Sequence, residues 1–231
     1  MAYTTIFFDL DGTLTDSSEG ITKSVQYALA KFGIAEAAER LLPFVGPPLH
    51  HSFMAFYDFD EATARRAVGY YREYFAERGM YENTVYAGIP ELLRALREAG
   101  RALSVVTTKP TFFAEQIVRH FALDGYFDRV IGAELDLTNS DKETLVRLAL
   151  AHYPEVARES VVMIGDREHD IIGAHANGIA SIGVTYGAGT LAALETARPT
   201  TIVRSVAELR SALLGCGAVV GEGHRPPRVG W

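Results

Sequence analysis

The stretch TTIFFDLDGT, residues 4–13, decides the fold of this 231-residue chain. Its first half is a short apolar run, which predicts a buried β-strand over Thr4–Phe8. Asp9 and Asp11 follow directly, and side chains two positions apart in a continuing strand would lie on the same face of the sheet. Gly12 makes a turn of the backbone after Asp9 easy. We expect a buried strand that ends in a pair of acidic side chains.

From Tyr86 onward, amphipathic helical stretches alternate with short apolar runs. This alternation is typical of a parallel sheet that helices cover on both faces. After Thr4–Phe8, the expected strands are Leu103–Thr107, Arg129–Ala133, Val161–Ile164 and Ile179–Val184. Right-handed crossovers between them would give an α/β fold with a doubly wound, Rossmann-like sheet, whose ligands bind outside the carboxyl ends of the strands.

Residues 17–85 break this alternation, because they predict successive helices without a convincing strand between them. One apolar stripe runs from Ile21 to Phe32, and a second, partly aromatic stripe runs from Ala64 to Phe75. We interpret the aromatic stripe as core packing rather than as a ligand-binding face. The expected organisation is an α/β core over residues 1–16 plus 86–214, a helical insertion over residues 17–85 and a flexible tail over residues 215–231.

Composition and charge narrow the range of partners. The chain has 22 Lys and Arg against 29 Asp and Glu, a formal net charge of −7, which argues against general binding to nucleic acids or anionic membranes. No apolar run approaches the ~18 residues of a membrane span, and the amino terminus does not resemble a secretory signal. Cys216 is the only cysteine, so an internal disulfide and a cysteine-rich metal site are excluded. We expect a soluble, cytoplasmic protein.

A second acidic motif, Gly165-Asp166-x-x-x-Asp170, follows the predicted strand Val161–Ile164. Mg²⁺ prefers oxygen ligands, so Asp166 and Asp170 could complete a coordination shell begun by Asp9. Taken alone, the motif also fits a solvated acidic loop.

Groups suited to a phosphoryl anion lie between the two acidic motifs. Thr107, Thr108 and Lys109 come at the end of a predicted strand, and Lys142 comes at a predicted helix start. A hydroxyl, exposed backbone N–H groups and an ammonium are the partners that phosphoryl oxygens need. Taken alone, Lys142 also fits a solvated surface position, but the order and context of the motifs favour a shared site.

Together these motifs closely resemble those of the haloacid dehalogenase superfamily of phosphohydrolases, in the same order and over residues 4–214. The insertion directly after the first motif resembles the inserted α-helical cap of one class in that superfamily. The segments Val106–Pro110 and Gly46-Pro47-Pro48 resemble the phosphoglycolate phosphatase-like branch. Asp11 argues against a dehalogenase, because the members that displace halide lack this second aspartate.

The resemblance implies a role for each matching residue. Asp9 would be the nucleophile that forms an aspartyl-phosphate. Asp11 would protonate the leaving alcohol and then activate the water that hydrolyses this intermediate. Thr107 and Lys142 would bind the phosphoryl oxygens.

The resemblance also implies a Mg²⁺ site formed by Asp9, the backbone carbonyl of Asp11, and Asp166, with Asp170 in support. A further set of residues is expected to bind the phosphate or the rest of the substrate: Gly12, Thr108, Lys109, Gly46 and Pro47, with His50 as a weaker candidate. The chain departs from the family pattern at two places. Thr108 stands where relatives often have asparagine, and Arg167-Glu168-His169 is a more charged loop centre than many relatives have.

The expected function is a Mg²⁺-dependent phosphatase whose partner is a small phosphorylated metabolite, such as a phosphoglycolate-like compound or a nucleoside monophosphate. A sugar-phosphate mutase of the same family and a non-enzymatic phospho-acceptor or binding protein are the alternatives. A response-regulator receiver fits less well, because such domains have ~120 residues and no helical insertion after their first strand. Substrate and oligomeric state stay open.

Overall fold

A computed structural model describes residues 3–136 and 138–215. Its main feature is a six-stranded sheet in the order β5-β4-β1-β6-β7-β8, in which every pair of neighbouring strands is parallel. This sheet confirms the predicted doubly wound α/β fold. Its strands are β1 (Thr5–Phe8), β4 (Ala102–Pro110), β5 (Arg129–Ala133), β6 (Val161–Gly165), β7 (Ala180–Val184) and β8 (Thr201–Val203).

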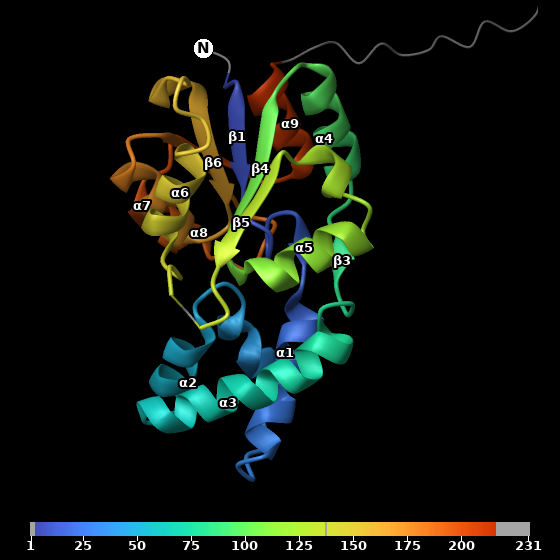
Figure 1. The fold of residues 1–231 in the computed structure, drawn as a ribbon, viewed down its shortest axis with the longest axis vertical. Helices are drawn as coiled ribbons and strands as arrows, with labels where there is room; N and C mark the ends of the chain where they lie inside the picture. Colours follow the sequence, from blue (N-terminus) through green and yellow to red (C-terminus); the bar gives the residue numbers. More distant parts are fainter. Residues whose placement is uncertain (1–2, 137, 216–231) are drawn as a thin grey trace, which may run out of the picture.

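Helices cover both faces of the sheet (Figure 1). In β1, Ile6 and Phe8 pack into one hydrophobic cluster, whereas Phe7 packs into a second cluster on the opposite face. The strand is therefore buried on both sides, which explains its continuous apolar run. The helices that follow the strands are α4 (Ile89–Glu98), α5 (Thr111–His120), α6 (Lys142–Leu150), α7 (Glu168–Ala176), α8 (Leu191–Ala197) and α9 (Val206–Leu214).

The helical insertion lies beyond the carboxyl ends of the sheet strands, at the bottom of Figure 1. The predicted stripes are largely buried: Val25 and Leu29 in α1, and Ala64 and Ala67 in α3, are fully covered. Asp60 begins α3 by accepting a hydrogen bond from the backbone N–H of Thr63 at 2.7 Å. The elements of the insertion are α1 (Ser18–Ala30), η1 (Ala38–Phe44), α2 (Leu49–Tyr57), α3 (Glu61–Tyr74) and η2 (Phe75–Gly79).

Two features of the described chain were not predicted. The edge strand β8 was missed, because its three residues are too few to show a periodicity. A short antiparallel ribbon, β2 (Thr15–Asp16) with β3 (Thr84–Val85), joins the two ends of the insertion. Residues 216–231 of the predicted tail, with Cys216, lie outside the described residues. Within the described ranges, no helix has the length and apolar character needed to cross a membrane.

Candidate active site

The backbone turns directly after Asp9, as Gly12 led us to expect. Three consecutive N–H groups, those of Thr13, Leu14 and Thr15, donate to the carbonyl oxygen of Leu10 at 3.3, 2.9 and 3.0 Å. Gly12 has φ +79°, and a Cβ there would overlap the carboxylate of Asp166. A glycine is therefore needed here, both for the left-handed backbone and for the close approach of β1's turn to the loop after β6.

Three buried carboxylates converge at this point. Asp9, Asp166 and Asp170 each place an oxygen within 4.8 Å of the others, and the exposed fraction of each residue is 4% or less. Because β1 and β6 are adjacent parallel strands, their carboxyl ends deliver these side chains to the same edge of the sheet.

Lys142 is the cation of this cluster. Its Nζ lies 2.7 Å from Asp170 Oδ1 and 3.0 Å from Asp9 Oδ1, and it donates to the carbonyl oxygen of Val106 at 3.0 Å. Burial opposes its charge, but Asp170 and Asp9 outweigh burial and raise the pKa of Lys142. Asp141, the preceding residue, accepts from the N–H of Thr144 and so begins α6 at this lysine.

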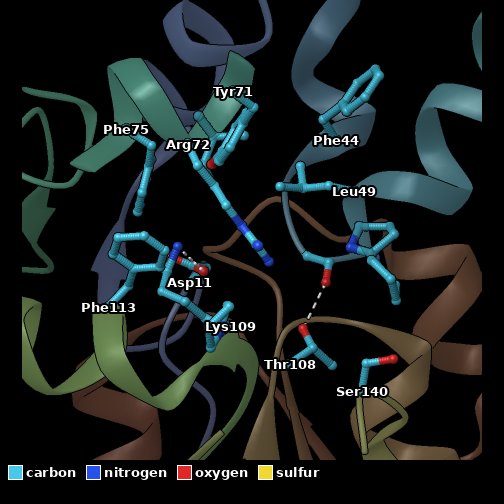
Figure 2. Close-up of a pocket in the computed structure, with 15 residues that line it drawn as sticks. Asp11, Phe44, Leu49, Tyr71, Arg72, Phe75, Thr108, Lys109, Phe113 and Ser140 are labelled. Atoms are coloured by element: carbon cyan, nitrogen blue, oxygen red, sulfur yellow. Dashed lines mark hydrogen bonds and ion pairs between the residues drawn. The ribbon is translucent and has the colours of Figure 1, made fainter. Parts of the chain in front are cut away.

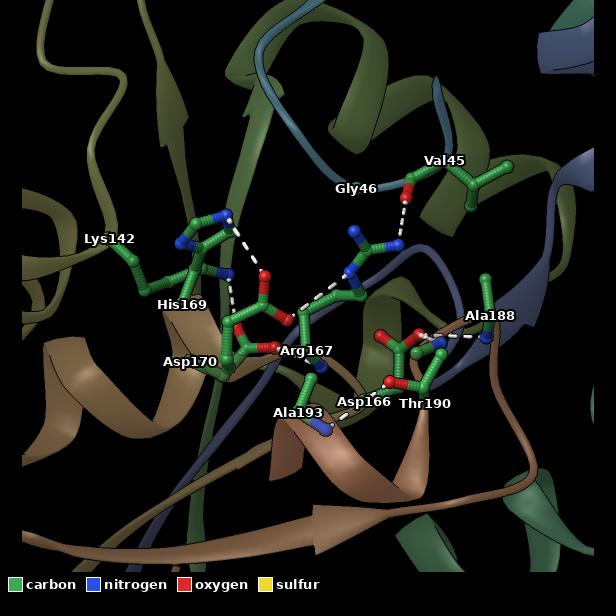
Figure 3. Close-up of polar contacts among 12 residues, drawn as sticks. Val45, Gly46, Lys142, Asp166, Arg167, His169, Asp170, Ala188, Thr190 and Ala193 are labelled. Carbon is green, nitrogen blue, oxygen red and sulfur yellow. Dashed lines mark hydrogen bonds and ion pairs between the residues drawn. The ribbon is translucent and has the colours of Figure 1, made fainter. Parts of the chain in front are cut away.

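Backbone donors hold Asp166. Its Oδ2 accepts hydrogen bonds from the N–H groups of Ala188 and Gly189 at 2.8 and 3.0 Å (Figure 3). Even so, burial, followed by repulsion from Asp170 and Asp9, raises the pKa of Asp166 to about 8. Burial also raises the pKa of Asp9, although Lys142 offsets part of that shift.

This donor set fits a divalent cation. With all three carboxylates ionised, the cluster and its one ammonium have a formal charge of −2 in a buried space, which a divalent cation would neutralise. Mg²⁺ prefers hard oxygen ligands of this kind. The carboxylate of Asp11 is not part of the cluster, so any contribution of Asp11 to the metal would come from its backbone carbonyl.

Asp11 instead faces a pocket between the core and the insertion. Its Oδ2 lies 2.9 Å from the Nζ of Lys109, and its buried Oδ1 has no hydrogen-bond partner among the described residues. The Lys109 ammonium also lies 4.5 Å from the ring centre of Phe75, a residue of the insertion. Asp11 thus lines the pocket with one carboxylate oxygen that has no partner among the described residues.

The predicted threonines have separate partners. Thr107 is buried, and its Oγ1 accepts from the backbone N–H of Lys109 at 3.2 Å. Thr108 lines the pocket and donates to the carbonyl oxygen of Gly46 at 2.9 Å (Figure 2). The loop containing Gly46 is therefore bound directly to the end of β4.

The pocket has mostly apolar walls. Of the predicted substrate-binding residues, Gly46, Pro47, Thr108 and Lys109 line it, while Gly12 and His50 do not. Its lining residues are Asp11, Ile21, Phe44, Gly46, Pro47, Pro48, Leu49, Tyr71, Arg72, Phe75, Thr108, Lys109, Pro110, Phe113 and Ser140.

The sequence interpretation missed the contribution of α3 to this pocket. Tyr71 and Phe75 are buried, as core packing requires, but they also form part of the pocket wall, together with Arg72. The sequence did indicate that these two side chains lie together, because Arg72 and Phe75 are three positions apart and so share one face of the helix.

Comparisons with known proteins agree with this geometry. The model of the family described as haloacid dehalogenase-like hydrolase matches residues 6–184, a span that contains every predicted site residue. A 5′-nucleotidase of Pseudomonas aeruginosa is 51% identical over 214 residues, which are 92% of this chain and 96% of that protein. The tyrosine-protein kinase PtkA of Mycobacterium tuberculosis is 36% identical over 211 residues, which are 90% of this chain and 72% of the kinase. A predicted phosphatase from Clostridium acetobutylicum has a similar crystal structure, with a TM-score of 0.89 and 51% identity, covering 93% of this chain and 99% of that one.

Proposed function

The chain belongs to the haloacid dehalogenase-like hydrolase family and is a phosphomonoester hydrolase, and from this premise we propose that it is a Mg²⁺-dependent 5′-nucleotidase. One observation is the main support for the proposed reaction. Asp9 lies in a cluster with two further carboxylates and Lys142, while Asp11 stands apart and presents an unpaired oxygen in the pocket. Two aspartates two residues apart thus have different surroundings, which suits them to different roles.

In the proposed first step, a carboxylate oxygen of Asp9 attacks the phosphorus atom. The new bond joins this oxygen to phosphorus as the bond from phosphorus to the leaving alcohol oxygen breaks. The proton of the Asp11 carboxyl passes to that oxygen, so the alcohol departs neutral. The protein is left with an aspartyl-phosphate at Asp9 and an ionised Asp11.

In the proposed second step, water attacks the same phosphorus atom. Asp11 takes a proton from this water as the bond between Asp9 and phosphorus breaks, which releases inorganic phosphate and restores both carboxyl groups. Lys142 lies 3.0 Å from Asp9, where its ammonium can offset negative charge on the phosphoryl oxygens, and Thr107 would donate to one of them.

Asp9, Asp166 and the backbone carbonyl of Asp11 would hold Mg²⁺, with Asp170 kept in place by Lys142 and by the backbone N–H of Arg167 at 3.1 Å. When bound, the ion would supply positive charge to the phosphoryl oxygens and reduce the repulsion among the carboxylates.

The pocket supports a nucleoside as the leaving group. Rings of Phe44, Tyr71, Phe75 and Phe113 form much of its wall, and flat aromatic surfaces suit a flat heterocyclic base. The relative from Pseudomonas aeruginosa that is named a 5′-nucleotidase is 51% identical to this chain over 214 residues. A two-carbon leaving group such as glycolate would leave most of these rings without a contact.

The test is phosphate release from a substrate panel, measured with Mg²⁺ and with excess chelator. The panel contains nucleoside 5′-monophosphates, phosphoglycolate, pyrophosphate, a sugar 1-phosphate and phenyl phosphate. We expect Mg²⁺-dependent release, with kcat/KM highest for a nucleoside monophosphate. A higher kcat/KM for phosphoglycolate or pyrophosphate would overturn the nucleotidase assignment. Isomerisation of the sugar phosphate without phosphate release would indicate a mutase instead.

A further inference from the structure

Arg72 stands out among the polar residues of the pocket. It extends from α3 into the pocket that Asp11 and Thr108 also line (Figure 2). Lys109, the other cation of this lining, has Asp11 as its partner at 2.9 Å. Arg72 has neither a carboxylate nor a hydrogen-bond acceptor as partner among the residues that the structure describes.

A half-buried guanidinium without a partner is an unfavourable arrangement for the free protein. Removal of a charge from water carries a cost in free energy unless an acceptor replaces the lost water. Burial accordingly lowers the pKa of Arg72. Since the side chain points into the pocket, a bound substrate would displace water from its N–H groups and could supply the acceptor that replaces that water.

The hydrogen-bonding character of Arg72 restricts that acceptor. A guanidinium has five N–H donors and no acceptor, so it can pair only with oxygen or nitrogen lone pairs. The Lys109 ammonium is a second donor, whereas the Thr108 hydroxyl gives its proton to Gly46 and can only accept from a ligand. A leaving group that reaches Arg72 and Lys109 therefore meets N–H donors, between flat aromatic walls.

We propose that Arg72 is a specificity-determining residue, which selects nucleoside monophosphates whose base has a carbonyl oxygen at purine C6 or pyrimidine C4 over those whose base has an amino group at that position. The inference rests on the proposed nucleotidase function and adds the class of base. A base with a carbonyl gives the guanidinium an acceptor, and 6-oxopurines add N7 beside O6 for a two-point contact.

An amino base would meet Arg72 with the wrong polarity. The N–H donors of an exocyclic amino group at this position would face the N–H donors of the guanidinium, so neither group would find an acceptor in the other. Loss of a hydrogen bond to a charged group predicts a discrimination of about tenfold or more.

Two substrate pairs test this inference, because the members of each pair differ mainly at one exocyclic group. These pairs are IMP with AMP, and UMP with CMP. For the wild type we expect the kcat/KM ratio to favour IMP and UMP by about tenfold or more. In Arg72→Met both ratios should fall to about 1, and in Arg72→Lys they should be intermediate, because lysine keeps donors but not the planar fork.

Arg65→Met is the matched control. Arg65 lies on the same helix, but its side chain is 59% exposed and pairs with Glu61, so this variant should keep both ratios. Each ratio compares two substrates on one enzyme, so a partial loss of folded protein cancels and a merely structural role of Arg72 would not change the ratio.

Three results would overturn the inference. The first is a wild-type preference for AMP and CMP, or no preference. The second is an unchanged pair of ratios in Arg72→Met. The third is a decrease in kcat/KM of Arg72→Met for phosphoglycolate alone, which would mean that Arg72 binds a carboxylate. Failure of the nucleotidase function is distinguishable from these, because wild-type protein would then hydrolyse other phosphomonoesters but none of the four nucleotides.

Discussion

The guanidinium of Arg167 donates a hydrogen bond of 2.9 Å to the carbonyl oxygen of Val45, which joins the loop after β6 to the helical insertion (Figure 3). Thr108 donates to the next carbonyl along the chain, that of Gly46, at the same distance. Thr108 is one of the two departures that the resemblance implies, and Arg167 belongs to the other, Arg167-Glu168-His169. Both departures thus contact one loop of the insertion and hold it against the core.

Variants of these two residues should therefore weaken substrate binding. Each lost hydrogen bond is worth ~1 kcal/mol, or about fivefold in an equilibrium constant, if closure of the insertion contributes to binding. We expect Arg167→Met and Thr108→Val each to raise KM for a nucleoside monophosphate about fivefold, with a smaller change in kcat. Steady-state kinetics gives both values. Arg158→Met, at an exposed arginine of the core, should behave as wild type, and an unchanged KM in both test variants would contradict this prediction.

Substitution of Gly46 should also act on KM. Gly46 has φ +105°, and a Cβ there would lie 3.2 Å from the side chain of Arg167. Gly46→Ala should displace the loop, raise KM several-fold and change kcat little. Gly33→Ala is the matched control, because Gly33 also has positive φ, at +76°, but a Cβ there would meet open space. It should lower the melting temperature without changing KM, and an equal effect of both substitutions on KM would remove the loop from the site.

Asp9→Asn should abolish turnover and preserve the fold. An amide is a far poorer nucleophile than a carboxylate, so we expect kcat to fall at least about a thousandfold. Circular dichroism should show an unchanged helix and strand content. Asp124→Asn, at an exposed aspartate, should keep full activity. Retention of more than about a tenth of activity in Asp9→Asn would contradict the nucleophile assignment.

The carboxylate cluster should make stability depend on pH and Mg²⁺. Burial and neighbouring carboxylates raise the pKa of Asp166 to about 8, whereas an unfolded chain releases this proton near pH 4. Without metal, stability should therefore fall as the pH rises from about 4 through about 8. At about pH 6, Mg²⁺ must displace the proton of the Asp166 carboxyl in order to bind, whereas at about pH 9 this proton is already lost. Mg²⁺ should therefore raise the melting temperature more at the higher pH.

Differential scanning fluorimetry with Mg²⁺ and with chelator measures this difference. Asp166→Asn, which cannot titrate at this position, should show a small Mg²⁺ effect that is similar at both pH values. The same increase in melting temperature at both pH values in the wild type would show that the carboxyl does not compete with the cation.

The sequence alone predicted the meeting of the carboxylates better than the walls of the pocket. Asp9 and Asp166 could be placed together because each directly follows a buried apolar strand, and parallel strands end at one edge of a sheet. Arg72 could not be placed, because its surroundings combine α3 with segments of the core that are distant in sequence. Lys109 was expected to contact the substrate, but its pairing with Asp11 depends on the three-dimensional course of two separate loops.

Very short elements escaped prediction for a related reason. A strand is recognised from the sequence by alternation or by an apolar run, and neither can be seen in two or three residues. Thr15–Asp16 and Thr84–Val85 form a ribbon only because the fold brings the two ends of the insertion together.

The β2–β3 ribbon also marks the boundary at which the insertion and the core can vary separately. Asp16 and Thr84 are direct partners in the β2–β3 register, so the insertion leaves the core and returns to it at one place. A segment of different length or sequence could replace residues 17–83 while the order of the six sheet strands stayed the same. Evolution can therefore exchange the insertion, which we propose selects the leaving group, while the sheet that carries the carboxylate cluster is kept.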